Sequence, residues 1–206
     1  LLRAIAGSPE QMQAIYGVRG ERRLEEFEIP WLSGYENSKP VRIGNAAFNQ
    51  FQLDVYGEIL AAIWQADRAG LKLEDAEWAL ILRLIKFLES NWQKPDEGIW
   101  EVRGGQQHFV YSKLMTWVAV DRALRLADKR SFPADRERWS LVRDQIYDQI
   151  MANGWDPKRE IFVQHFGSDG LDAANLMMPL VFFVSPTEPR MLKTLDATCQ
   201  PPQRGG

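Results

Sequence analysis

The chain has 206 residues, of which 45% are apolar and 26% are charged, as in an ordinary globular protein. Its net charge is −3, and acidic and basic residues are interspersed. No basic stripe is present to bind nucleic acid or an anionic membrane, so we expect neither partner. Cys199 is the only cysteine, which excludes a disulfide framework and argues against a cysteine-based metal site.

Apolar residues recur at three- and four-residue intervals through most of the chain, which is the period of amphipathic helices. The first predicted helix presents Phe48, Phe51, Val55, Ile59 and Ile63 on one face and stops at Gly70. A second helix carries Trp78, Ile81, Ile85 and Leu88, and a third carries Leu114, Trp117, Val118 and Leu124. The fourth is predicted to start at Pro133 and to end at Asn153-Gly154, with Trp139, Val142, Ile146 and Ile150 inside it.

Two further helices are predicted near the C-terminal end. Segment 172–184 is apolar on almost every side, as in a helix buried all round, and Pro179 should kink or shorten it. Its longest apolar run, 176–184, is shorter than the about 20 residues of a membrane-spanning helix. Thr187 is predicted to cap a last helix toward Ala197. No alternating strand pattern is found, so the predicted fold class is all-α, without a sheet of three or more strands.

The loop lengths indicate how these helices are arranged. Short links near 70–74 and 128–132 join helices into pairs, and long loops at 93–110 and 153–171 join successive pairs. Loops longer than about 12–15 residues are usually functional or disordered, and the aromatic residues in these two favour order. We expect the long loops to gather at one end of the array and to carry the function.

The predicted pairs begin near Asn49, Tyr111 and Asp172, at intervals of about 60 residues. This spacing is typical of a helical-hairpin array. The sequence starts without a methionine and closes on a Pro- and Gly-rich stretch. We therefore expect it to be truncated at both ends. No signal peptide is visible, and a cytoplasmic location is expected.

Residues 91–105, which include most of the first long loop, contain three carboxylates and two tryptophans. Glycosidases use one carboxylic acid to protonate the leaving oxygen and a second carboxylate opposite it. Tryptophan rings stack on the C–H faces of sugars, and Glu101, between Trp100 and Val102, would be partly desolvated, as suits a proton donor. Composition alone favours the alternative that Asp96 and Glu97 are solvated turn residues and that Glu101 caps the next helix.

Three motifs alter that balance. Segment 95–124, PDEGIWEVRGGQQHFVYSKLMTWVAVDRAL, resembles the signature of glycoside hydrolase family 15, which contains bacterial glucoamylases, glucodextranases and some trehalases. Upstream, WLSGY at 31–35 and PVRIGNAA at 40–47 are similar to a second signature. QHFGSDGLDA at 164–173 is similar to a third. The motifs occur in the family's order, and the resemblance runs nearly from end to end.

The resemblance implies an (α/α)6 barrel with a substrate pocket in the loops at one end, of which residues 1–206 would be a partial catalytic domain. It also implies that Glu101 is the general acid and that Trp100 belongs to the sugar-binding wall. By the same resemblance, Arg42 and Asn45 approach the pocket, and Arg42 hydrogen-bonds glucose hydroxyl groups. An ion pair of Arg42 that holds its own loop is the structural alternative.

His108 and Lys113 belong to the same motif and are further candidates for substrate binding. A cationic tether or a residue at a helix start explains each of them equally well. His108 and His165 are the only histidines, so we expect no zinc site, and no cofactor is implied.

Two parts of the family's site are missing from this sequence. An arginine–aspartate pair that grips the nonreducing glucose is expected before residue 1, and the general base, a glutamate, is expected beyond Gly206. The implied reaction is hydrolysis, with inversion, of α-linked glucosides such as maltooligosaccharides, isomaltooligosaccharides or trehalose. This piece alone is expected to be inactive, and to self-associate through apolar inner faces such as 176–184.

The alternative function is a non-catalytic α-hairpin module that binds carbohydrate or protein. Protein-binding hairpin arrays have short, similar loops and apolar stripes on a concave face. The long, dissimilar and aromatic loops of this sequence therefore favour the enzyme.

Overall fold

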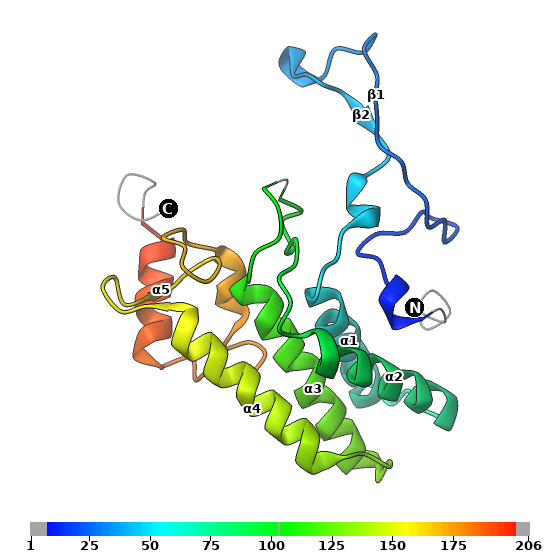
Figure 1. Ribbon diagram of the computed structural model, residues 1–206, viewed down its shortest axis with the longest axis vertical. Coiled ribbons are helices and arrows are strands. Elements are labelled where there is room, and N and C mark those ends of the chain that lie inside the picture. The colour runs from blue at the N-terminus through cyan, green and yellow to red at the C-terminus, as the bar shows by residue number, and fades with distance from the viewer. Residues whose placement is uncertain (1–7, 103, 201–206) are drawn as a thin grey trace.

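The computed structural model describes residues 8–102 and 104–200 (Figure 1). The α-helices of this part are α1 (Asp54–Arg68), α2 (Asp75–Asn91), α3 (Val110–Arg130), α4 (Arg136–Asn153) and α5 (Pro189–Thr198). Four short 3-10 helices are η1 (Pro9–Gln11), η2 (Tyr35–Asn37), η3 (Ala46–Asn49) and η4 (Ala173–Met177). The strands form two antiparallel pairs, β1 (Phe27–Glu28) with β2 (Arg42–Ile43) and β3 (Trp155–Asp156) with β4 (Ile161–Phe162). Within the described residues no sheet has more than two strands, so the all-α prediction is confirmed.

Helix α3 lies at the centre of the helices and packs on α1, α4 and, less extensively, α2 (Figure 1). Every residue from Phe109 to Leu124 is buried, including the polar Ser112 and Thr116 and the charged Lys113. Buried polar groups need hydrogen-bond partners. The Thr116 hydroxyl donates to the Ser112 carbonyl within α3, and Lys113 donates to carbonyl groups at the end of α2. Among the helices that the structure describes, none has the length and apolar character to cross a membrane.

Helices α1 and α3 run side by side in the same direction. Near their starts, the Tyr111 hydroxyl donates to Glu58 Oε1 at 2.6 Å. At their ends, Lys129 Nζ donates to Asp67 Oδ2 at 2.7 Å. Parallel helices that belong to successive hairpins are what a barrel of helical hairpins requires of its inner layer.

Gly57 allows the two helices to approach closely. A Cβ atom at this position would lie 2.1 Å from the Met115 carbonyl oxygen, well inside van der Waals contact. The backbone of α1 therefore rests directly on the backbone of α3 at this crossing. A glycine in a helix interior costs about 0.5–1 kcal/mol relative to alanine, and the close contact offsets that cost.

The first two predicted hairpins, α1–α2 and α3–α4, are present with corrected boundaries, whereas the third lacks its first helix. The first helix begins at Asp54, so Phe48 lies in η3 instead of on the same helix face. Helix α4 begins at Arg136 and not at Pro133, because the Asp135 side chain caps it by accepting from the Arg138 N–H at 3.1 Å.

The last predicted helix is also present, with a different cap. Helix α5 is capped by Glu188, whose carboxylate accepts from the Met191 N–H at 3.1 Å. Thr187, the predicted cap, instead has its hydroxyl 2.9 Å from the Ser185 hydroxyl. Both residues precede the proline that starts the helix, and the longer Glu188 side chain reaches the free N–H.

The prediction of a buried helix over 172–184 is wrong. After η4 the chain continues in turns, with Phe182 in a left-handed conformation at φ 67°. Pro179 has no N–H with which to continue a helical ladder, and the buried Arg122 of α3 donates to the Val181 carbonyl at 2.9 Å. Leu180 and Phe182 are exposed, so the segment is not covered on every side as predicted.

The long loops gather at one end of the helices, as predicted. Phe109 and His165 form an isolated antiparallel bridge, and the Phe166 N–H donates to the His108 carbonyl at 3.0 Å. The loops that precede α3 and η4 are thereby joined at the end where α1 and α3 begin. The segment that carries β1 and β2 extends away from this end as an arm (Figure 1).

Candidate active site

The loop that carries Glu101 is closed at its base by a backbone pair. The Asp96 N–H donates to the Gln107 carbonyl at 3.0 Å, and the Gln107 N–H donates back at 2.9 Å. The loop between them is therefore closed at its base, and it carries Trp100 and Glu101. Closing a loop in this way restricts the positions that its tip can adopt.

The tip is a tight turn shaped by two left-handed residues. Gly98 has φ 70°, and a Cβ there would lie 2.6 Å from the Phe109 ring. Glu101 has φ 51°, and its N–H donates to the Gly98 carbonyl at 3.3 Å. A left-handed conformation is unfavourable for a residue other than glycine, and such strain concentrates at functional sites.

Asp96 and Glu97 hold the base of the loop on the segment that precedes α1. Asp96 Oδ2 accepts the Leu53 N–H at 2.9 Å, and Glu97 Oε2 accepts the Phe51 N–H at 2.9 Å. The alternative that both are solvated turn residues is therefore wrong, since Asp96 is fully buried. N–H groups near a helix start lack partners within the helix, and these carboxylates supply them.

A pocket of about 430 Å³ lies between the Glu101 loop, the start of α1 and the N-terminal segment. Its lining consists of Met12, Gln13, Ala14, Tyr16, Gln52, Asp54, Val55, Glu58, Ile59, Ile99 and Glu101. This volume is within the range of about 300–1,000 Å³ found for small-molecule sites. The pocket brings three carboxyl groups together, of which only Glu101 was a predicted site residue.

Asp54 is a buried acid in this pocket. Its pKa is raised to about 7, first by burial and then by the charges of Asp96 and Glu58. The backbone N–H groups of Asp54 and Val55 oppose this shift. Oδ1 of Asp54 has no hydrogen-bond partner among the described residues. The carboxyl group therefore carries a proton over much of the range below neutrality.

Asp54 and Glu58 lie outside the three motifs, but the sequence contains a signal for both. They lie four residues apart, and thus on one face, in a helix whose neighbouring positions are apolar. Two acids one turn apart at the start of an otherwise buried helix indicate a polar pocket.

Lys113, a predicted substrate-binding residue, is fully buried and does not line the pocket. Its Nζ donates to the carbonyl oxygens of Trp92 and Lys94, both at 2.5 Å. Burial lowers the pKa of Lys113 to about 8, against the opposing effect of the Asp96 charge. The ammonium group thus lies at the C-terminal end of α2, where a positive charge is favourable.

His108 is packed between the two long loops. Its ring stacks on Phe166 with centroids 5.6 Å apart, and Nδ1 is buried without a partner in the described part of the chain. Burial, and to a smaller extent the Lys113 charge, lower the pKa of His108. It is therefore a neutral imidazole at physiological pH, and it does not line the pocket.

The structure places Arg42 and Asn45 away from Glu101. Arg42 lies on the arm, with Nε 3.2 Å from Glu26 Oε1 and an Nη atom 3.2 Å from Glu28 Oε1. This is the arrangement of the structural alternative. Asn45 caps η3, and its Oδ1 accepts from the Ala47 N–H at 2.8 Å. Neither residue lines the pocket, and their predicted contacts with sugar stay predictions.

Trp100 joins the first long loop to the next. Its Nε1 donates to Asp172 Oδ1 at 2.9 Å, and Asp172 also caps η4 by accepting from the Ala174 N–H. The indole is held at its edge while 56% of the residue is exposed. An indole fixed in this way can present a ring face to a ligand, and its predicted role in the sugar-binding wall stays a prediction.

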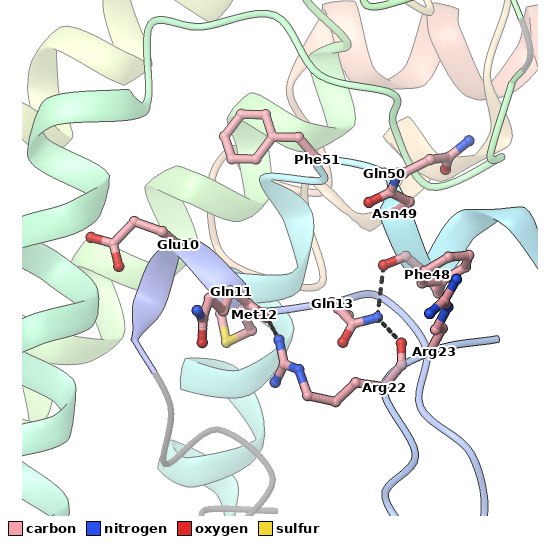
Figure 2. A pocket seen from close by; sticks show the side chains of 10 residues that line it. All are labelled: Glu10, Gln11, Met12, Gln13, Arg22, Arg23, Phe48, Asn49, Gln50 and Phe51. Atoms are coloured by element: carbon pink, nitrogen blue, oxygen red, sulfur yellow. Dashed lines mark hydrogen bonds between the residues drawn. The ribbon is translucent and has the colours of Figure 1, made fainter. Parts of the chain in front are cut away.

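A second hollow, of about 450 Å³, shares Met12 and Gln13 with the first. Figure 2 shows the side chains that line this second hollow. Gln13 lines both hollows, and its Nε2 donates to the carbonyl oxygens of Arg22 and Phe48, both at 2.7 Å. None of the predicted site residues lines the second hollow, and Glu10 is its only acid. The pocket that contains Glu101 is therefore the candidate active site. Within residues 8–102 and 104–200, no group of three His, Cys, Asp or Glu residues could hold a metal ion.

Parallel inner helices, outer helices joined to them by short links, and an acidic pocket between the Glu101 loop and the start of α1 define this chain as part of an α/α barrel of the glycosidase type. The chain belongs to the glycosyl hydrolases family 15, whose family model matches residues 1–200. The resemblance inferred from the three motifs is thereby confirmed.

Similar proteins include several trehalases. The trehalase of Mycolicibacterium smegmatis is 40% identical over 191 residues, which are 93% of this chain and 28% of that protein. The trehalase of Mycobacterium tuberculosis is 40% identical over 186 residues, which are 90% of this chain and 27% of that protein. The trehalase of Thermoplasma acidophilum is 34% identical over 185 residues, with 90% and 32% covered. The chain thus spans about a third or less of the length of these relatives.

Solved structures of glycosidases have a similar fold. A glycosidase variant in complex with glucose superposes with a TM-score of 0.60 at 24% identity, covering 74% of this chain and 42% of the other. A second glycosidase variant gives a TM-score of 0.61 at 23% identity, covering 79% and 44%. At this level of identity the likeness concerns the fold, and it agrees with the predicted part of an (α/α)6 barrel.

Proposed function

We propose that this chain is part of the catalytic domain of an α-glucoside hydrolase, with Glu101 as the general acid and trehalose as the substrate. The position of Glu101 carries the proposal. It lies at the tip of a closed loop, in a strained conformation, and lines a pocket of about 430 Å³ with two more carboxyl groups. The identity of 34–40% with proteins named trehalases supports trehalose over maltooligosaccharides and isomaltooligosaccharides.

In this mechanism the Glu101 carboxylic acid donates its proton to the glycosidic oxygen as the bond to the anomeric carbon breaks. A second carboxylate activates a water molecule on the opposite face of the sugar, and the configuration inverts. The two carboxyl groups of an inverting enzyme are about 6.5–9.5 Å apart. By the family resemblance, the second carboxylate lies outside this chain.

The base of the loop suits this role. Asp96 and Glu97 fix the loop to the segment before α1, while Lys113 holds the carbonyl groups that precede it. A proton donor must be placed within hydrogen-bond distance of the leaving oxygen, so a loop held at its base favours donation.

The test is Glu101→Gln in the full-length protein. Glutamine keeps the shape of the side chain but cannot donate the proton, so hydrolysis of trehalose should fall by about 10²–10⁴-fold. Hydrolysis of α-glucosyl fluoride, whose leaving group needs no proton, should fall much less in this variant. Glu89→Gln is the control, because Glu89 accepts from Arg138 at 2.6 Å and does not line the pocket.

Near-normal hydrolysis of trehalose, maltose and isomaltose by the Glu101→Gln protein would overturn the assignment of the acid. A wild-type protein that binds these sugars without hydrolysing any of them would instead favour the non-catalytic carbohydrate-binding module. If the reaction inverts, NMR recorded before mutarotation would show one β- and one α-glucose from each trehalose, whereas retention would give only α-glucose.

A further inference from the structure

Glu58 is an exception in the first half of α1. All residues from Gln52 to Leu60 except Glu58 are buried or partly buried. Glu58 is exposed and lines the pocket that contains Glu101. An exposed acid on a helix is normally a solvated residue. Glu58, however, is held in place from the neighbouring helix.

Tyr111 of α3 holds this carboxylate. Its hydroxyl donates to Glu58 Oε1 at 2.6 Å, and Tyr111 itself is buried. Burial, then the hydrogen bond to Glu58 and the charges of Glu58, Asp54 and Asp172, raise the pKa of the Tyr111 phenol. Tyr111 therefore remains a neutral donor, and Glu58 has a fixed orientation with Oε1 occupied.

The surroundings of Glu58 favour a neutral polyol as the ligand. Asp54, one helical turn earlier, is a buried acid, and Val55, Ile59 and Ile99 supply apolar surface. This combination of apolar walls with a few fixed acceptors is how sites bind small polar molecules. Among the described residues, no Lys or Arg side chain lines the pocket, so none of these residues favours a phosphorylated or other anionic sugar.

We propose that Glu58 is a substrate-binding residue whose carboxylate, oriented by Tyr111, accepts hydrogen bonds from sugar hydroxyl groups in the Glu101 pocket. This inference rests on the proposed function, because it assigns a further contact to the same site. The alternative is that the Tyr111–Glu58 pair only joins α1 to α3. A purely structural link needs only one acceptor oxygen on residue 58 and no negative charge there. A substitution that keeps the oxygen and removes the charge therefore separates the structural role from substrate binding.

The decisive measurement is binding without turnover. In the full-length Glu101→Gln protein, trehalose should bind and not be cleaved, so calorimetry gives its Kd directly. Adding Glu58→Gln keeps the acceptor for Tyr111 but replaces the free carboxylate oxygen with an amide group. The Kd for trehalose should then rise by about 10- to 100-fold, the range expected for losing a hydrogen bond to a charged group.

Thermal unfolding distinguishes a substrate contact from a structural link. Glu58→Gln should leave the unfolding midpoint unchanged, because the bond from Tyr111 is kept. Tyr111→Phe should lower the unfolding midpoint. It should also weaken trehalose binding, but by less than Glu58→Gln does. Glu89→Gln, which alters a carboxylate that also joins two helices, should change neither Kd nor the midpoint.

Monodeoxy trehaloses identify the contact. One of them should bind the Glu101→Gln protein much more weakly than trehalose does, because a site built for a hydroxyl group rejects an analogue that lacks it. That same analogue should lose little further affinity when Glu58→Gln is added. An unchanged Kd for trehalose in the double variant would overturn the role of Glu58. Failure of the proposed function would show in a different measurement, because the wild-type protein would then not hydrolyse trehalose.

Discussion

The carboxylate of Asp96 accepts the backbone N–H of Leu53 at 2.9 Å and so joins the base of the Glu101 loop to the residue that precedes α1. Asp96 is fully buried, and its pKa is raised because burial outweighs the hydrogen bonds and the Lys113 charge that favour the ionised form. Two segments 43 residues apart in sequence are thus held together by a single side chain.

Asp96→Ala should destabilise the protein and lower its activity. The Leu53 N–H would be left buried without an acceptor, at a cost of about 1–3 kcal/mol. Asp96→Asn keeps an acceptor of the same size, so its loss of stability should be clearly smaller. Urea unfolding and trehalose hydrolysis measure the two effects. Equal stability of the Ala and Asn variants would show that the Leu53 bond contributes little.

Gly57→Ala, which adds a single methyl group, should clearly destabilise the protein. The new Cβ would lie 2.1 Å from the Met115 carbonyl oxygen, so α1 and α3 would have to separate. Overpacking of this kind costs about 1–3 kcal/mol, which outweighs the gain in helix propensity. The matched control is Gly104→Ala, where a Cβ meets no atom within 4 Å. Similar unfolding midpoints for the two variants would contradict the close contact.

Asp54→Asn should change how stability depends on pH. The pKa of Asp54 is raised from 3.8 to about 7 in the folded protein, so the folded state binds more protons than the unfolded state between these values. The stability that protonated Asp54 gives the folded state is fully present below about pH 4 and is lost as the pH rises through 7. The free energy of unfolding falls by up to about 1.4 kcal/mol per pH unit in this range. The Asn variant should gain stability relative to the wild type from pH 4 to 8. A constant difference over this range would refute the raised pKa.

Asp67 should show the opposite pH dependence. Burial raises the pKa of Asp67, but hydrogen bonds and positive charges from Lys129 and Arg130 outweigh it and hold the pKa below its usual value. The stabilisation is present above the unfolded pKa and is lost as the pH falls through the lower folded pKa. Asp67→Asn should therefore cost about 1–3 kcal/mol at pH 7 and progressively less in acid.

A surface carboxylate provides the comparison for Asp67. Asp144 pairs with its neighbour Arg143 on the exposed side of α4, at 2.8 Å. Exposed pairs contribute about 0–1 kcal/mol, so Asp144→Asn should leave the unfolding midpoint nearly unchanged at every pH. If Asp67→Asn behaved in the same way, the link between the ends of α1 and α3 would be unimportant for stability.

The helices other than α3 were predictable because each buries one face, and the 3.6-residue period records that face; α3 is instead buried on every side as far as Leu124. Segment 172–184 was not predictable, because hydrophobicity alone does not reveal that Arg122 binds the Val181 carbonyl. Asp96 also looked like a solvated residue, since its acceptor role depends on a backbone group distant in sequence. Long-range polar contacts of this kind leave no periodic pattern.

For the site, the motif resemblance identified Glu101, and the structure places it in a pocket. The resemblance also drew attention to Lys113 and Arg42, which the structure uses in local contacts outside that pocket. Glu58 was missed, although its spacing from Asp54 was visible. A motif records which residues a family keeps, and it does not separate those that touch a ligand from those that support the loop.

The backbone pair between Asp96 and Gln107 has an evolutionary consequence. Since the two ends of the loop meet there, residues can be inserted or deleted between them without shifting α2 or α3, and lengthening a closed loop costs little entropy. Mutational drift in loop length is thereby confined to the stretch that bears Trp100 and Glu101. New substrate preferences could arise by such changes while the helical framework is inherited intact.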